Sequence, residues 1–168
     1  PAKGHAMRHR IAAAATAALI ASGPAAAQIW ERFERPDYRF AIEVPDSLFD
    51  IREKGGDRDR VTWRTRSGDI VLEAFSLPVG MAVSPARILA LRQESFPERV
   101  ITYEASKEGW AVVSGYETAA RDRIFYERFE SAQRSAYWAG FVLRWNVTRR
   151  ADVDDTVKRI GQSLTVTR

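Results

Sequence analysis

The acidic side chains between positions 122 and 130 are the ones whose spacing could support a hydrolytic reaction. Glycoside cleavage requires two carboxylates that face each other at a defined separation across a cleft. Glu127 with Glu130, or Asp122 with Glu127, would provide the two groups. Neighbouring side chains of a regular strand point to opposite faces, so Glu127 and Glu130 would point apart. This geometry makes carboxylate catalysis an alternative rather than the leading hypothesis.

Histidine and cysteine chemistry can be excluded more firmly. The chain has no cysteine, and its two histidines, His5 and His9, lie in an N-terminal segment that we expect to be removed. The mature chain would then lack Ser-His-Asp and Cys-His catalysis, zinc binding through nitrogen or sulfur, and haem attachment. Ser114 lies in VVSGY, which is not the G-x-S-x-G nucleophile motif. We predict a strand end at this serine.

A glycine-rich segment, EKGGDRDR at residues 53–60, contains the best candidate ligands for a metal ion. Calcium takes six to eight oxygen ligands, whereas Asp57 and Asp59 supply few and are flanked by arginines that oppose a cation. We predict a solvated loop, no metal site and no cofactor.

Arginines of the same region could bind an anion. Arg64 and Arg66 are predicted to share a strand face, near Arg58 and Arg60, with Glu73 across the hairpin. A solvated face of mixed charge is the competing interpretation. We keep Arg64 and Arg66 as candidate binding residues.

Aromatic residues are the other candidates for a binding surface. The stretch from Trp110 to Phe129 reads WAVVSGYETAARDRIFYERF, and its alternation is typical of core strands. The chain nevertheless has five Trp and five Tyr, so we expect some rings at the rim of the core. Large rings beside arginine suit protein interfaces. The candidates are Tyr116, Tyr126, Tyr137 and Trp138.

The N-terminal segment has the features of a secretory signal peptide. Arg8 and Arg10 precede an apolar run from Ile11 to Ala21, and Ala25-Ala26-Ala27 provides a small-x-small cleavage signal. The apolar run is shorter than the roughly 20 residues that span a bilayer. We expect residues 1–6 to be a cloning remnant or a misplaced start, residues 7–27 to be the signal peptide, and residues 28–168 to form one domain. The mature protein would be periplasmic or secreted, without stable membrane insertion.

Cleavage also changes the net charge. The whole chain carries 26 basic and 22 acidic side chains, a net charge of +4. Removal of Lys3, Arg8 and Arg10 leaves 23 basic against 22 acidic side chains, a net charge of +1. A balanced charge argues against a nucleic-acid partner.

Alternating apolar positions along the mature chain predict about seven antiparallel strands. The strands are expected at Tyr38–Val44, Val61–Arg66, Ile70–Leu77, Val100–Ala105, Trp110–Gly115, Arg123–Ser131 and Ser135–Val147. The last strand is apolar on both faces, which predicts a central position with cover on both sides. Residues 28–36 are read as a polar lead-in and residues 46–49 as a turn.

Two helices complete the prediction. Ser84 is a good N-cap and Pro85 fits the first helical position, with Pro97 ending this helix. Asp152 is expected to cap the second helix, whose apolar stripe is Val153, Val157, Ile160 and Leu164. The fold class is therefore α+β, an antiparallel sheet of about six or seven strands covered by two main helices.

Several segments in this order resemble PsbP-like proteins. YRFAIEVPDSLFDI resembles the opening strand and proline turn of that fold. ITY, W-x-V-V-S-G, R-I-F-Y-E-R and D-x-V-x-R-I-x-x-S-L resemble a group of uncharacterised exported proteobacterial proteins. The resemblance covers roughly Tyr38 to Leu164 and implies a PsbP-like α/β/α sandwich. It also implies an accessory or binding role, but it transfers no site residue and no photosystem partner.

The leading functional hypothesis is an exported, non-enzymatic accessory or binding module. Its expected partner is a protein of the cell envelope, contacted through aromatic and arginine side chains on one sheet face. A small ligand between sheet and helix is the second option. The alternative from another class is a carboxylate-dependent hydrolase acting on an envelope polymer, which two carboxylates converging in a deep cleft would favour.

Overall fold

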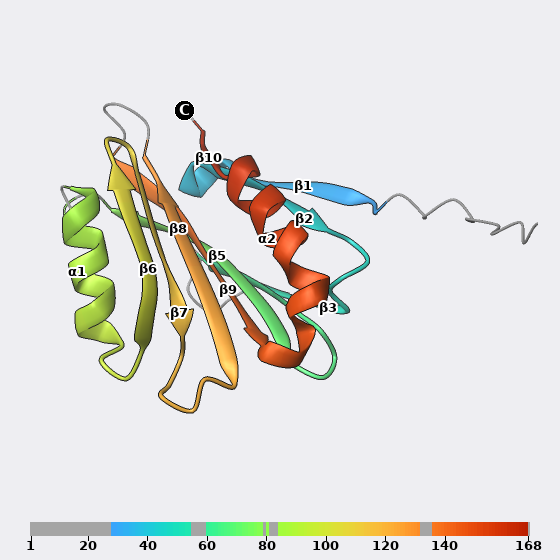
Figure 1. The fold of residues 1–168 in the computed structure, drawn as a ribbon. Helices are drawn as coiled ribbons and strands as arrows, with labels where there is room; N and C mark the ends of the chain where they lie inside the picture. The colour runs from blue at the N-terminus through green and yellow to red at the C-terminus, as the bar shows by residue number, and fades with distance from the viewer. Residues whose placement is uncertain (1–27, 55–59, 79, 81–83, 132–135, 168) are drawn as a thin grey trace, which may run out of the picture.

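The computed structural model describes residues 28–54, 60–78, 80, 84–131 and 136–167, which build two antiparallel sheets and two α-helices (Figure 1). The larger sheet has seven strands in the order β3-β4-β5-β9-β8-β7-β6. These strands are β3 (Ile51–Lys54), β4 (Arg60–Arg64), β5 (Ile70–Pro78), β6 (Val100–Lys107), β7 (Trp110–Tyr116), β8 (Arg123–Glu130) and β9 (Tyr137–Asn146). The smaller sheet has the order β1-β2-β10, with β1 (Trp30–Arg35), β2 (Phe40–Pro45) and β10 (Thr165–Val166).

The two helices lie on opposite faces of the larger sheet, which confirms the predicted α+β class with two covering helices (Figure 1). Helix α1 (Pro85–Ser95) contacts β6 and β7. Helix α2 (Arg150–Ser163) contacts β2 and β9, and the small sheet reaches β5 and β9. We call the two sheet surfaces the α1 face and the α2 face.

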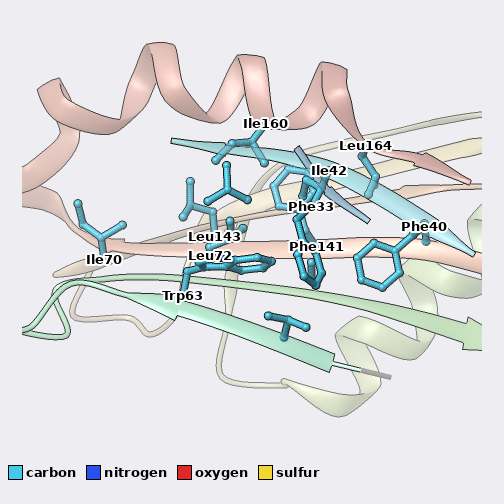
Figure 2. Close-up of a cluster of buried hydrophobic side chains, with 14 of the residues drawn as sticks. Phe33, Phe40, Ile42, Trp63, Ile70, Leu72, Phe141, Leu143, Ile160 and Leu164 are labelled. Carbon is cyan, nitrogen blue, oxygen red and sulfur yellow. The ribbon is translucent and has the colours of Figure 1, made fainter. Parts of the chain in front are cut away.

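Strand β9 lies at the centre of the sheet and divides two hydrophobic cores, as its two-sided apolar pattern predicted. Its residues Ala139, Phe141, Leu143 and Trp145 belong to the core on the α2 face (Figure 2). Its residues Trp138 and Val142 belong to the core on the α1 face. Alternate side chains of β9 therefore belong to the hydrophobic cores on the two opposite faces of the sheet.

The core on the α2 face is built from three layers. Phe40 and Ile42 of β2 and Ile160 of α2 lie over Leu72 of β5 and Phe141 of β9, and all five side chains are fully buried (Figure 2). The core on the α1 face is smaller and packs α1 against β7, β8 and β9. Both faces of one sheet are thus held by hydrophobic burial.

Three strands were not predicted from the sequence. β1 lies in the predicted polar lead-in, β3 ends in the predicted glycine-rich loop, and β10 follows the predicted second helix, where no element was expected. β1 has a single buried residue, Phe33, among its six, and β3 and β10 have only four and two residues, so the apolar alternation is weak. Their partners are β2 for β1 and β10, and β4 for β3.

The first helix begins as predicted and the second does not. The Ser84 hydroxyl accepts a hydrogen bond from the Arg87 amide at 3.2 Å, with Pro85 at the first helical position. Helix α2 begins at Arg150, so Asp152 lies in its first turn and is not the N-cap. The reason is the 3-10 turn η3 (Val147–Arg149), which already curves the chain before the helix.

Some predictions fall on residues outside the described ranges. These are the expected remnant at residues 1–6, the signal peptide at residues 7–27, Asp57, Arg58 and Asp59 of the glycine-rich segment, and Ser135 at the start of the last predicted strand. Within the described ranges, neither helix has the length and apolar character needed to cross a bilayer.

Candidate binding surface

The positions of the helices leave part of each sheet face without a covering element in the described structure. Helix α1 lies over β6 and β7, while α2 and the small sheet lie over β5 and β9 on the other face. The α2 face of β6, β7 and β8 therefore lies beside α2 rather than under it (Figure 1). This part of the sheet carries the exposed ring of Tyr103 and the half-buried rings of Trp110, Tyr116 and Tyr126.

We call this surface the aromatic face and define it by Tyr103, Trp110, Tyr116, Tyr126 and Arg128. Strand pairing brings it together, because Ser114 of β7 is opposite both Tyr103 of β6 and Tyr126 of β8. Tyr103 is 55% exposed, whereas Trp110, Tyr116, Tyr126 and Arg128 are half-buried. The alternation of β7 and β8 places these side chains on one face.

Arginine side chains cover two of the rings. The Arg128 guanidinium lies 5.5 Å from the Trp110 ring centroid, and that of Arg121 lies 5.5 Å from the Tyr116 ring. Arg128 also pairs with Glu130 on the same strand face. Burial raises the pKa of Glu130 above its ordinary value of 4.5, although Arg128 opposes the change. The surface therefore combines rings with partly desolvated charge, a composition common in protein interfaces.

A hollow of about 230 Å³ lies where the aromatic face meets α2, and we call it the α2 hollow. Its walls come from β6, β7, β8, β9 and the first half of α2. The lining residues are Thr102, Ser114, Gly115, Tyr116, Ile124, Tyr126, Trp145, Arg150, Asp154 and Val157.

Tyr126 joins the aromatic face to the core. Its ring stacks on Phe141 with centroids 5.8 Å apart and an interplanar angle of 30°. The tyrosine hydroxyl lies beside Gly161 of α2, since a Cβ atom built there would lie at an ordinary contact distance of 3.6 Å from it. The ring therefore has neighbours on both the sheet and the helix.

Tyr116 and Tyr126 are the two candidate residues that the structure brings together, since both line the α2 hollow. Trp138 is a correction, because it is only 4% exposed and packs in the core on the α1 face. Because β9 is apolar on both faces, its sequence alone does not show which of its aromatic side chains reach the surface. Tyr137 is half-buried at the start of β9, opposite Pro78 of β5.

The candidate arginines lie elsewhere. Arg64 is on the α1 face of β4 and donates to Glu53 of β3, with its Nη2 2.7 Å from the carboxylate. Arg66 follows the end of β4 and lines a wide, open hollow of about 680 Å³ with Arg149. The predicted common strand face of Arg64 and Arg66 is thus wrong, because the strand ends before Arg66. Glu73 lies across the hairpin, as expected, and pairs with Arg60 and Arg144.

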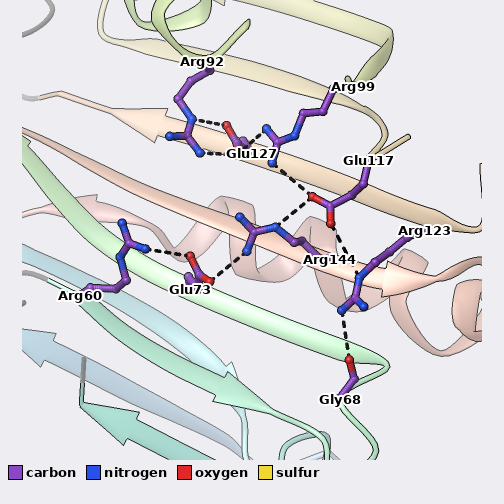
Figure 3. A network of polar contacts seen from close by, with 9 residues as sticks. All are labelled: Arg60, Gly68, Glu73, Arg92, Arg99, Glu117, Arg123, Glu127 and Arg144. Atoms are coloured by element: carbon purple, nitrogen blue, oxygen red, sulfur yellow. Dashed lines mark hydrogen bonds and ion pairs between the residues drawn. The ribbon is translucent and has the colours of Figure 1, made fainter. Parts of the chain in front are cut away.

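Glu127 is the most tightly held carboxylate of the described residues singled out above. It is fully buried on the α1 face, and Arg92 of α1 binds both its oxygens at 2.7 and 2.8 Å (Figure 3). Arg99 donates to it at 2.9 Å. Burial would raise the pKa of Glu127, but the two arginines outweigh it and lower the pKa below its ordinary value of 4.5.

The pairs proposed for hydrolysis do not converge. Glu127 points into the α1 side, whereas Glu130 lies on the α2 face with Arg128. Asp122 is exposed in the turn before β8, five residues from Glu127, which corresponds to about 16 Å along a strand. Among the residues that the structure describes, no group of three Asp, Glu, His or Cys side chains could hold a metal ion.

A chain of ion pairs extends from Glu127 across the α1 face (Figure 3). Arg99 links Glu127 to Glu117 at 3.3 Å, and Arg144 links Glu117 to Glu73 at 3.1 and 3.0 Å. Arg60 completes the chain at 3.4 Å from Glu73. The charged side chains of this network on the α1 face are therefore paired with one another.

Comparison with known proteins yields similar folds. No family model matches the chain, and no curated protein matches it. The solution structure of cyanobacterial PsbP (CyanoP) from Synechocystis sp. PCC 6803 matches with a TM-score of 0.58 and 10% identity, over 88% of this chain and 98% of that one. The Ran-binding protein Mog1p of Saccharomyces cerevisiae matches with a TM-score of 0.56 and 6% identity, over 83% of this chain and 96% of that one.

The chain has a PsbP-like fold. The fold expected from the sequence resemblance is therefore confirmed, and identities this low carry the fold alone. The helices on opposite faces of a central antiparallel sheet are the α/β/α layers of that fold.

Sequence reasoning missed three residues of the aromatic face on this PsbP-like fold, Tyr103, Trp110 and Arg128. It also missed Trp145 and Arg150 of the α2 hollow. The alternation of β7 could have indicated Trp110, which has the same parity as Tyr116. Tyr103 depended on the bulge in β6, where the register shifts between Ile101 and Tyr103, and the sequence carried no clear signal for it.

Proposed function

We propose that this protein is an exported accessory or binding module that contacts a partner protein through the aromatic face. The observation that carries the proposal is the convergence of Tyr103, Trp110, Tyr116 and Tyr126 on a sheet surface beside α2. Buried aromatic anchors supply much of the binding energy in protein interfaces, and nearby arginine adds directed hydrogen bonds.

Three further observations support a binding role. Mog1p, which shares the fold, is named as a Ran-binding protein. The candidate carboxylate pairs of the hydrolase alternative point apart or lie far from each other. The N-terminal segment is typical of a signal peptide, which supports action in the periplasm or outside the cell.

The test is photocrosslinking from defined positions. A photoreactive phenylalanine derivative replaces Tyr103 on the aromatic face, and in a matched protein it replaces Arg64 on the α1 face of β4. Both side chains are exposed enough to replace without opening a core. The chain from Gln28 onward is irradiated in an envelope extract of the organism that encodes it.

We expect one protein to be crosslinked from position 103 and not from position 64. Tyr116→Ala in the position-103 protein should remove this product while circular dichroism shows an intact fold. Equal labelling from both positions, or the same product with Tyr116→Ala, would mean that the aromatic face is not the contact surface.

A further inference from the structure

We propose that the α2 hollow is a binding pocket for a carboxylate group carried on a short apolar stem. This inference builds on the proposed function, because the pocket opens on the aromatic face. The shared chemistry fits either an acidic side chain of the partner or a free small carboxylic acid.

The donor that we assign to the pocket is the indole N–H of Trp145. Trp145 is only 4% exposed and lines the hollow, and its Nε1 atom is buried without a hydrogen-bond partner among the described residues. Buried polar groups in proteins are almost always paired, and an unpaired donor is costly. This atom has almost no accessible surface, so the indole must turn toward the hollow before an acceptor on a ligand can correct the deficit.

The charge that favours a carboxylate over a neutral acceptor is Arg150. Its side chain is 67% exposed and makes one contact with Asp154, at 3.3 Å from Nε. The guanidinium has five N–H groups in a fork that matches a carboxylate. Asp154 is the single carboxylate lining the pocket and opposes an anion, so Arg150 must turn from Asp154 toward the ligand.

The remaining walls suit an apolar stem. Ile124 and Val157 face the hollow together with the rings of Tyr116 and Tyr126. Hydroxyl groups of Thr102 and Ser114 lie on the β6 and β7 side, and the Thr102 hydroxyl donates to the Ser114 carbonyl at 3.4 Å. The pocket lining therefore combines apolar and polar side chains.

The volume sets the size of the occupant. The hollow of about 230 Å³ lies below the roughly 300–1,000 Å³ of pockets that enclose drug-sized ligands. One side chain, or a small acid of similar size, fits this space. Pockets of this kind hold the anchor residues of protein interfaces.

The experiment uses phenylacetate as the probe and phenylacetamide as its neutral control. The chain from Gln28 onward is labelled with ¹⁵N, and Trp145→Phe assigns the Trp145 indole signal among the five tryptophans. We expect phenylacetate to move the Trp145 N–H signal downfield, with a Kd on the order of millimolar for a ligand of about ten heavy atoms. Phenylacetamide should bind more weakly.

Two variants test the assigned contacts. Arg150→Gln changes an exposed side chain and should weaken phenylacetate about tenfold, the usual effect of one hydrogen bond to a charged group, while leaving phenylacetamide unchanged. Ser114→Leu should fill the hollow and abolish both. If Ser114→Leu fails to fold, Arg150→Gln still decides the charge requirement.

The outcomes separate this inference from the proposed function. A Trp145 signal that neither probe moves at saturating concentration overturns the pocket, even if crosslinking from position 103 succeeds. Equal binding of acid and amide, unaffected by Arg150→Gln, overturns the carboxylate requirement. If phenylacetate binds and displaces the crosslinked partner, the natural carboxylate belongs to that partner. If phenylacetate binds and no partner is captured or displaced, a free acid is the ligand.

Discussion

At the scale of single residues, the buried charge of Glu127 is the feature whose role changed most between sequence and structure. The sequence made it a candidate acid or base. The structure surrounds it with Arg92 and Arg99, and Arg99 is itself only 3% exposed. A carboxylate held in this way links α1 to the sheet, and that role accounts for its position without catalysis.

Glu127→Gln is expected to lower the free energy of unfolding by about 3–5 kcal/mol, because it leaves buried arginine charge without its partner. The matched control is Glu94→Gln, which breaks an exposed pair with Arg87 at 3.0 Å and should cost less than about 1 kcal/mol. Urea denaturation monitored by tryptophan fluorescence measures both. Similar small losses in the two variants would show that the buried pair contributes little.

The same variant has a defined pH signature. The folded pKa of Glu127 lies below its ordinary value of 4.5, so the ionised form stabilises the fold above about pH 4.5. This contribution is lost as pH falls below that value toward the folded pKa. Stability curves between about pH 5 and 3 should therefore fall less steeply for Glu127→Gln than for the parent. Parallel curves would contradict the lowered pKa.

At the scale of elements, the edge strand β6 depends on a close approach to β7. A Cβ atom on Gly115 would lie 2.0 Å from the Val100 carbonyl oxygen and 3.0 Å from the Ile101 Cα. Both are backbone atoms, so no side chain can move aside. The bulge between Ile101 and Tyr103 begins here and sets the position of Tyr103 on the aromatic face.

Gly115→Ala is therefore expected to destabilise the protein by about 1–3 kcal/mol through overpacking. Hydrogen exchange should lose protection in β6 first, while β8 and β9 keep theirs. Gly80→Ala is the control, because a Cβ atom there meets nothing within 4 Å, and its effect should stay within about 0.5 kcal/mol. Unchanged β6 protection in Gly115→Ala would show that the strand shifts without penalty.

Element existence was predictable where apolar alternation was long. β5, β7, β8, β9 and α1 were expected close to their observed bounds, because each buries a regular face. β1 was missed because Phe33 is the one buried residue among its six, and β3 and β10 were missed because they have four and two residues. The start of α2 was missed because the 3-10 turn η3 replaces a side-chain N-cap.

At the scale of the whole molecule, the buried side chains of the described residues run from Phe33 to Leu164. Removal of the segment before Gln28 is a prediction from its signal-peptide features.

The predicted cleavage can be checked directly. Expressed in a bacterial host with its N-terminal segment, the protein should be recovered from the periplasm with Gln28 as its first residue, as measured by intact mass. Leu19→Arg places a charge in the apolar run and should retain the uncut chain in the cytoplasm. Periplasmic protein that keeps residues 7–27 would contradict cleavage after Ala27.

The sequence by itself determined the layers of this protein, because hydrophobic periodicity is a local property that reports which side of each strand and helix is buried. It also showed that the chain has no cysteine and no histidine after position 9, so that the mature protein would lack catalysis and metal binding by these side chains. Only the tertiary structure decided which side chains meet. Trp138 and Tyr116 look alike in sequence, yet one lies under α1 and the other opens on the α2 hollow. That difference follows from where each helix lies on the sheet, which is set by contacts between residues far apart in the chain.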